Sequence, residues 1–248
     1  MMKIFDRMFF IGASSLGDNF VLTGIAHHFG DRCNELHVPA MPGNFETLNT
    51  LYQDFPNIKV ISTDSYNDEQ EYIDKNKLGR ILRTEYLSWH VKNYRLVPMW
   101  DLQLYSNYEL SYGLRYSNFR LPKYIKGSDE LYDRLSQGEP YILVHRYTAN
   151  HPTGLPIDIP AFRQICNLPP IKIIEINDQI TDNMMHYVKL IQNAEEIHVV
   201  PSSFHCLVDG VDTKAKLFFH DIREKTAMAA NSQWNNFKWT MVSYSERL

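Results

Sequence analysis

The segment GASSLGD, residues 12–18, brings one carboxylate directly behind a run of small residues. The hydrophobic residues before it are typical of a buried strand, and those after it are typical of a helix. Ser14, Ser15 and Gly17 permit a ligand to approach the backbone closely. Asp18 then lies in the first turn of the expected helix, where it either stabilises the helix N-terminus or acts as a general base on a substrate.

A histidine and an arginine end the strand expected over PYILVHR, residues 140–146. The forked guanidinium of Arg146 can hold a phosphate group, and a salt bridge to a neighbouring domain is the alternative. His145 can donate a hydrogen bond to the same phosphate or to a sugar, or it is a buried histidine bonded to the backbone. Both residues are candidates for binding a nucleotide donor.

Two serines follow another expected strand, in HVVPSSFHCLVDG at 198–210. We expect Ser202 and Ser203 at the N-terminus of a helix, where backbone N–H groups and hydroxyls can bind a pyrophosphate. Ordinary N-capping of the helix by serine is the alternative.

Charged residues also follow two further expected strands. Glu175 and Asp178 come at the end of IKIIEIN, where a carboxylate can bind ribose hydroxyls, and helix capping by Asp178 competes with that interpretation. Arg223 follows AKLFFHD and is a second candidate phosphate ligand, although Asp221 and Glu224 can neutralise it.

The sequence has no arrangement that is typical of a bound metal. Its ten histidines do not combine H-x-x-x-H spacing with acids, and no D-x-D pair lies in an expected loop. We therefore expect chemistry that needs no metal. The cysteines Cys33, Cys166 and Cys206 are odd in number and widely spaced, which favours free thiols in a reducing compartment.

Charge and hydropathy exclude several classes of protein. The formal net charge is −4 and no dense Lys/Arg tract is present, so we expect no nucleic-acid partner. No apolar run approaches the roughly 18 residues needed to span a bilayer, so no transmembrane segment is expected. Asp6 and Arg7 interrupt the N-terminal apolar stretch, unlike in a signal peptide. These features predict a cytoplasmic protein.

The elements that must position these side chains alternate between strand and helix twice along the chain, which indicates parallel β-α-β units. In the first half we expect strands at 3–12, 35–40 and 58–63, and helices at 16–29, 44–55 and 66–76. The aromatic middle is irregular, with a helical pattern over part of 99–112.

The second half repeats this order. We expect strands at 140–146, 171–177, 196–200 and 215–221, and helices at 129–137, 159–167, 181–194 and 202–210. Thr181 or Asp182 is the expected N-cap of the third helix, and the strand at 215–221 is expected to be the last parallel one. An α/β fold follows, with two doubly wound, Rossmann-like domains at 1–115 and 116–248 that face each other across a cleft. Ligands of such sheets bind at the carboxyl ends of the strands.

The segment SSLGDNFVLTGIAHHF, residues 14–29, resembles the N-terminal signature of the heptosyltransferase-like glycosyltransferases of family 9. In that family a Ser-Leu-Gly-Asp segment leads into the first helix. The resemblance implies the GT-B fold, with an N-terminal domain on the acceptor side and a C-terminal domain that binds the nucleotide-sugar. It also implies metal-independent, inverting transfer without a cofactor, and it places Asp18 at the position of the proposed general base.

The chemistry of an inverting transfer suits this assignment. One carboxylate must take the proton of the acceptor hydroxyl as its oxygen attacks the anomeric carbon, which contributes roughly 10²–10⁴-fold in rate. The departing nucleoside diphosphate needs positive charge or aligned N–H groups from the other domain.

The donor-side element departs from the family pattern. The family carries an aspartate, a small or hydroxyl residue, a glycine and then a histidine, whereas here Pro201 replaces the acid and Ser203 stands in place of glycine. His205 is displaced by about one position, and it remains a candidate donor-binding residue. The resemblance therefore does not specify heptose or any other donor sugar.

The sequence thus predicts an inverting glycosyltransferase that moves a hexosyl or pentosyl group from a nucleotide-sugar to a glycan or other hydroxyl acceptor. A nucleotide-sugar epimerase of the same architecture and a catalytically inactive nucleotide- or glycan-binding protein are the alternatives. A methyltransferase is disfavoured, because the first strand–helix loop lacks a G-x-G signature.

Overall fold

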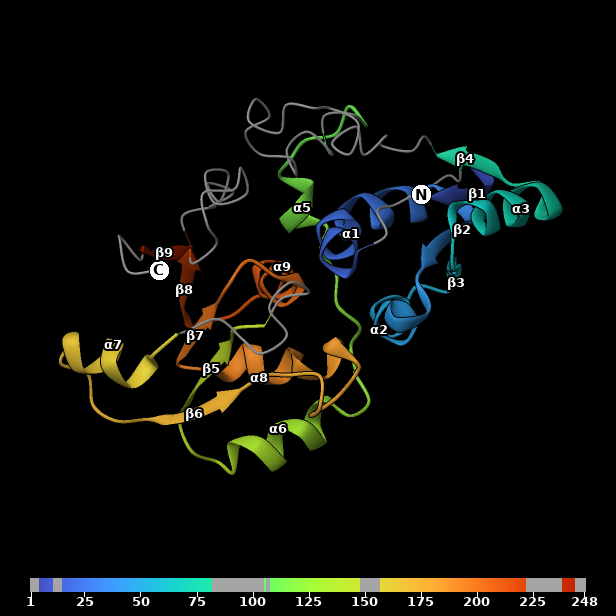
Figure 1. Ribbon diagram of the computed structural model, residues 1–248. Helices are drawn as coiled ribbons and strands as arrows, with labels where there is room; N and C mark the ends of the chain where they lie inside the picture. The colour runs from blue at the N-terminus through green and yellow to red at the C-terminus, as the bar shows by residue number, and fades with distance from the viewer. Residues whose placement is uncertain are drawn as a thin grey trace. The chain divides into compact units, whose positions relative to one another are not determined.

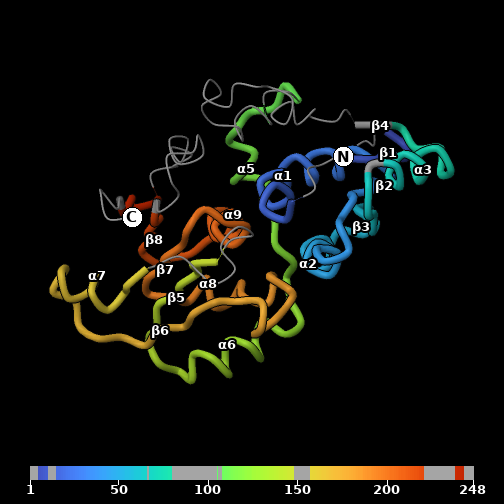
Figure 2. Tube along the Cα trace, in the orientation of Figure 1, coloured from blue at the N-terminus to red at the C-terminus, as the bar shows by residue number. Residues whose placement is uncertain are grey.

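The residues that the computed structural model describes are 5–10, 15–81, 105, 108–147, 157–221 and 238–243. The chain divides into two compact units, Met1–Ile125 and Lys126–Leu248. Each unit is a parallel sheet with helices, which confirms the predicted Rossmann-like α/β class (Figure 1). The backbone of each unit can be followed from element to element in Figure 2.

The first unit contains a four-stranded parallel sheet in the order β3-β2-β1-β4. Its elements are β1 Phe5–Phe10, α1 Leu16–Gly30, β2 Cys33–Ala40, α2 Pro42–Tyr52, β3 Ile58–Ser62, α3 Tyr66–Asn76, β4 Gly79–Ile81 and α5 Leu114–Ser117. The sequence pattern did not indicate β4, because its three residues are too few to show a period.

The order of the strands reverses at β1. The chain runs from β1 to β2 to β3 and then returns to place β4 on the other side of β1. Right-handed crossovers therefore place α1 and α2 on one face of the sheet and α3 on the opposite face. On the α3 face, Phe9 packs with Ile73 and Leu78. The reversal creates a topological switch point between β1 and β4, where sheets of this kind bind ligands at the carboxyl edge.

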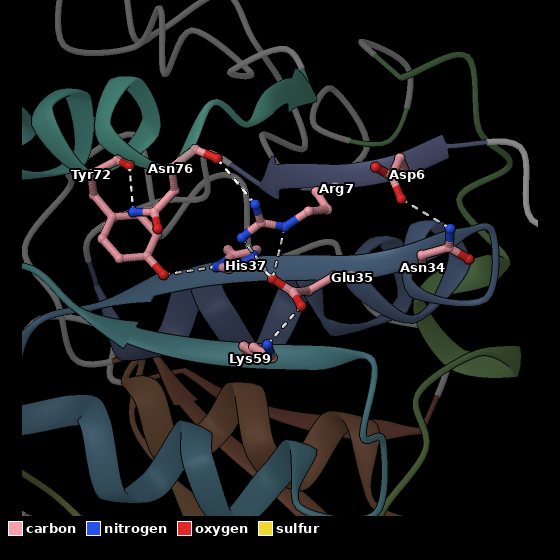
Figure 3. Close-up of polar contacts among 8 residues, drawn as sticks. All are labelled: Asp6, Arg7, Asn34, Glu35, His37, Lys59, Tyr72 and Asn76. Carbon is pink, nitrogen blue, oxygen red and sulfur yellow. Dashed lines mark hydrogen bonds and ion pairs between the residues drawn. The ribbon is translucent and has the colours of Figure 1, made fainter.

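A polar network on the α3 face joins three strands of this sheet (Figure 3). Glu35 of β2 accepts hydrogen bonds from Lys59 of β3 at 2.6 Å and from Arg7 of β1 at 3.2 Å. Nε2 of His37 contacts the same carboxylate, and Nδ1 lies 3.0 Å from the hydroxyl of Tyr72 in α3. Hydrogen bonds from Lys59, and then from His37 and Arg7, outweigh burial and lower the pKa of Glu35 to about 2. The charges of Glu35, Lys59 and Arg7 are therefore paired with one another.

The second unit contains a five-stranded parallel sheet in the order β6-β5-β7-β8-β9. Its elements are α6 Ser128–Ser136, β5 Tyr141–His145, α7 Ile159–Ile165, β6 Lys172–Glu175, η3 Met184–Tyr187, α8 Val188–Asn193, β7 Glu196–Val199, α9 Ser203–Gly210, β8 Lys216–Asp221 and β9 Trp239–Ser243. The chain moves from β5 to β6 and then crosses back to β7, so this sheet has its switch point between β5 and β7.

Two sequence-based expectations for this unit are wrong. The strand β8 is not the last parallel strand, because β9 pairs with it in parallel over Leu217–Asp221. The helix expected at 181–194 is a 3₁₀ turn followed by α8, and its N-cap is Asn183, whose side chain accepts the N–H of Met185 at 3.0 Å. Asparagine caps helices as well as aspartate does, and the hydroxyl of Thr181 is used by the preceding turn.

The first unit extends to Ile125 rather than to residue 115. The reason is that the segment around α5 is bonded to α1. The hydroxyl of Tyr105 donates to the carbonyl of Val21 at 2.8 Å, and the side-chain amide of Asn118 donates to the carbonyl of Gly24 at 2.8 Å. The helix expected within 99–112 falls largely outside the described residues.

At Gly24, α1 and this segment approach each other closely. A Cβ atom built there would lie 2.3 Å from the carbonyl oxygen of Leu114 and 2.8 Å from the hydroxyl of Tyr105. Only a residue without a side chain fits between the two, so Gly24 allows the segment to pack on α1.

We predict that Gly24→Ala destabilises the protein by about 1–3 kcal/mol, because the new methyl group overlaps backbone that cannot move aside cheaply. Gly43→Ala in α2 is the matched control, since a Cβ there meets nothing within 4 Å. The control should be neutral or stabilise by up to about 1 kcal/mol through helix propensity. Urea unfolding of both variants measures the difference, and equal stabilities would contradict the close approach.

Candidate functional site

Asp18 lies beside the switch point of the first unit. The helix α1 follows β1 directly and begins at Leu16, so Gly17 and Asp18 are its second and third residues. Ser15 is the N-cap, and its hydroxyl accepts the backbone N–H of Asp18 at 3.2 Å. Ser14 lies outside the described residues. The structure thus places the side chain of Asp18 in the first helical turn at the carboxyl edge of the sheet.

The environment of Asp18 opposes its ionisation. The side chain is partly buried. Burial raises the pKa of Asp18 to about 6, against the hydrogen bond to Ser15, which lowers it. A carboxylate with such a pKa is a stronger base than an ordinary aspartate and is still largely ionised above pH 7.

A second helix shows what ordinary capping looks like in this protein. In α3, Ser65 is the N-cap and accepts the N–H of Asp68 at 3.2 Å, which is the same Ser-x-x-Asp arrangement. Asp68 is exposed, and its carboxylate accepts the backbone N–H of Asp64 at 3.1 Å. Helix capping therefore does not require the burial found at Asp18, so the capping interpretation alone does not explain that residue.

In the second unit, two predicted donor-binding residues pair with each other. Nε of Arg146 lies 2.8 Å from Oε1 of Glu175, and Nη2 lies 3.3 Å from Oε2. The hydroxyl of Tyr147 also contacts this carboxylate. The salt bridge of Arg146 therefore runs to the end of the neighbouring strand in its own unit. Sequence reasoning missed Tyr147, for which the only signal was an aromatic residue just after a buried strand.

The pair remains charged although neither member is fully exposed. The side chains of Arg146 and Glu175 are 33% and 35% exposed. Burial works to raise the pKa of Glu175, but hydrogen bonds from Arg146 and Tyr147 outweigh it and lower the pKa. The hydrogen bond to Glu175 raises the pKa of Arg146. The carboxylate of Glu175 thus binds the guanidinium of Arg146 at the carboxyl edge of the sheet, where an anionic ligand is expected.

The switch point of the second unit brings His145 and Ser202 together. His145 is the last residue of β5, and Ser202 is the N-cap of α9, which follows β7. Oγ of Ser202 lies 3.2 Å from Nδ1 of His145 and accepts the N–H of His205 at 3.3 Å. Burial lowers the pKa of His145 to about 4, so its ring is neutral at pH 7. Ser202 therefore caps the helix, and it also contacts a second predicted site residue.

The remaining predicted residues are dispersed. Ser203 is the first residue of α9. Asp178 is exposed in the loop after β6 and does not cap the next helix, whose N-cap is Asn183. His205 is buried, with its ring 4.8 Å from that of Phe219 in β8, so the structure places it in the core of the unit. Arg223 lies outside the described residues.

Neither a protein family model nor a curated protein matches the sequence. Solved structures do match. A glycosyltransferase of family 9 from Veillonella parvula DSM 2008 superposes with a TM-score of 0.56 over 98% of this chain and 86% of that one, at 8% identity. The fold is similar to that of glycosyltransferase family 9.

Two further structures agree. The ADP-heptose lipopolysaccharide heptosyltransferase II of E. coli gives a TM-score of 0.53 at 12% identity, covering 95% of this chain and 90% of that one. The iron-containing dodecameric glycosyltransferase TibC of enterotoxigenic E. coli H10407 gives 0.51 at 13% identity, covering 87% of this chain and 59% of that one. At these identities the similarity is one of fold.

Two searches of the described ranges concern other kinds of site. Within these ranges, His, Cys, Asp and Glu side chains form no group of three that could hold a metal ion. Among the helices in the same ranges, none combines the length and apolarity required to cross a bilayer.

We predict that Asp18→Asn stabilises the protein by about 1–2 kcal/mol at pH 7.5 and has little effect near pH 4. The pKa of Asp18 is raised from 3.8 to about 6 on folding, so folding takes up protons between these values and stability falls as the pH rises through them. The amide of asparagine does not ionise, so Asp18→Asn lacks this loss of stability.

Asp68→Asn is the control, because it changes the same helical position at an exposed site. It should lose about 0.3–1 kcal/mol at pH 7.5, since the helix N-terminus favours a negative charge. Thermal unfolding at both pH values measures the two effects. A wild-type protein that is as stable as Asp18→Asn at pH 7.5 would contradict the assigned environment.

Proposed function

We propose that the protein is a metal-independent, inverting glycosyltransferase. In this proposal it moves a hexosyl or pentosyl group from a nucleotide-sugar to a glycan or other hydroxyl acceptor. The observation that carries the proposal is the partly buried carboxylate of Asp18, with its raised pKa, beside the switch point of a fold similar to that of family 9 glycosyltransferases. The first unit then activates the acceptor, and the second binds the donor.

The proposed reaction uses Asp18 as the general base. Its carboxylate takes the proton of the acceptor hydroxyl while that oxygen forms a bond to the anomeric carbon of the donor. The bond from the anomeric carbon to the diphosphate breaks on the opposite side, so the configuration inverts and the electron pair leaves with the nucleoside diphosphate. A pKa of about 6 leaves the base ionised at neutral pH and strong enough to assist the transfer.

The donor is proposed to bind at the carboxyl edge of the second sheet. Arg146 would bind a phosphate oxygen, and Glu175 would accept hydrogen bonds from ribose hydroxyls. Because the two side chains now bind each other, a ligand must offer both an anion for Arg146 and a diol for Glu175 to replace that pair. A nucleoside diphosphate offers both. Ser203, Asp178 and Arg223 remain candidate contacts, whereas the burial of His205 disfavours a direct one.

We predict that one of UDP, GDP, ADP, CDP and dTDP raises the melting temperature of the protein, because a ligand at 100 times its dissociation constant adds about 2.7 kcal/mol of stability. Arg146→Gln should lose this shift. Arg134→Gln, on the exposed side of α6, should keep it. If none of the five nucleotides shifts the unfolding of the wild-type protein, the donor assignment is wrong.

We predict that Asp18→Ala lowers the turnover of the nucleotide-sugar whose nucleotide binds by about 10²–10⁴-fold while nucleotide affinity is unchanged. Asp68→Ala, which removes the exposed acid of the matched helix, should keep full turnover. Transfer is followed by release of the nucleoside diphosphate in the presence of a hydroxyl acceptor.

The outcomes of that assay separate the alternatives. Full turnover in Asp18→Ala would remove the base assignment. Nucleotide binding without turnover of any donor would support a non-catalytic binding protein. Conversion of the donor to an epimeric nucleotide-sugar without an acceptor would support an epimerase.

A further inference from the structure

Ser202 and His145 touch across the switch point of the second unit. They come from different elements, the start of α9 and the end of β5, and their Oγ and Nδ1 atoms are 3.2 Å apart. Sequence patterns made each residue separately a candidate for direct contact with phosphate. The contact between them suggests a division of roles, in which one residue sets the state of the other.

The hydrogen bonds of Ser202 indicate which group receives its hydroxyl proton. Its oxygen accepts the backbone N–H of His205 at 3.3 Å, as an N-cap does, so the hydroxyl proton is free to be donated. The nearby Nδ1 of His145 can accept it, because the buried ring is neutral and a neutral imidazole has one unprotonated nitrogen. An imidazole that accepts at Nδ1 carries its own proton on Nε2.

The ring of His145 is held in place by its neighbours. It stacks on Phe204 of α9 with 5.1 Å between ring centroids, and Tyr147 meets it edge-on at 6.1 Å. Nδ1 contacts Ser202, and no hydrogen bond joins Nε2 to another of the described residues. The Nε2–H group is therefore the part of the ring that is available to a ligand.

We propose that Ser202 is a positioning residue, whose hydroxyl holds neutral His145 in the Nε2–H form so that His145 donates a hydrogen bond to a phosphate oxygen of the bound nucleoside diphosphate. The ligand in this inference rests on the proposed function. The state of the ring does not, because it follows from contacts within the second unit alone.

The arrangement has a consequence for pH dependence. The ionisable groups around His145 are Arg146 and Tyr147, which follow it directly in the chain, and Glu175 at the end of β6. The pKa of Glu175 is lowered, and those of Arg146 and Tyr147 are raised, so none of the three titrates near neutrality. The pKa of His145 is about 4. The protonation state of His145 should therefore contribute no change in binding between about pH 6 and 8.

The test replaces the hydroxyl while keeping the helix capped. Glycine is nearly as good an N-cap as serine, so Ser202→Gly removes the hydroxyl with little loss of helix stability. Ser202→Thr restores a hydroxyl. Ser65→Gly, at the N-cap of α3, measures the effect of the same change on capping alone.

Two readouts are needed. Nitrogen-15 NMR of the imidazoles reports the tautomer of His145, and calorimetric titration reports the affinity for inorganic pyrophosphate between pH 6 and 8. We expect the Nε2–H tautomer in the wild-type protein and in Ser202→Thr. We expect a shift toward the Nδ1–H tautomer in Ser202→Gly, with about tenfold weaker binding. Ser65→Gly should match the wild-type protein in both readouts.

Several results would overturn the inference. A wild-type His145 protonated at Nδ1, or a tautomer in Ser202→Gly that is the same as in the wild-type protein, removes the positioning role. Weaker binding with an unchanged tautomer would mean that Ser202 contacts the ligand itself. Failure of the wild-type protein to bind pyrophosphate or any nucleotide would instead count against the proposed function, and the NMR result would still decide the role of Ser202.

Discussion

Each unit of this protein depends on a reversal in the order of its parallel strands. In the first sheet the chain winds outward from β1 and returns to its other side at β4, and in the second it winds outward from β5 and returns at β7. The connections on either side of a reversal leave along opposite faces, and in sheets of this kind the crevice between them at the carboxyl edge binds ligands. Asp18 follows β1, and the His145–Ser202 pair joins the ends of β5 and β7.

Polar groups inside the second sheet are paired with one another. A parallel sheet is covered on both faces, so any charge within it must be paired. Glu196 of β7 binds Arg163 of α7 at 2.7 Å, and His198 joins this carboxylate to His220, 2.8 Å away on β8. Burial lowers the pKa of His198 to about 4 and that of His220 to about 3, so both rings stay neutral. These hydrogen bonds join β7 to β8 and to α7.

The two Ser-x-x-Asp helix starts place their acids in different environments. In α3 the acid is exposed and bonded to the preceding backbone, so it stabilises its helix. In α1 the same acid is partly buried at a raised pKa, so its charge costs stability. Residues that oppose stability at a ligand-binding edge are typical of sites shaped by function. The contrast supports catalysis by Asp18 more directly than the motif does.

The sequence by itself determined the α/β class, the order of most helices and strands, and the placement of Asp18, Arg146 and Ser202 at the ends of strands. These follow from local periodicity and from capping residues, which act over a few positions. Only the tertiary structure decided the strand orders, the added strands β4 and β9, and the pairs across the sheet. His145 and Ser202 are 57 positions apart and Arg146 and Glu175 are 29 apart, so their contacts depend on β5 lying between β6 and β7. Local sequence patterns do not specify which strands are neighbours, because the strand order depends on the packing of the whole unit.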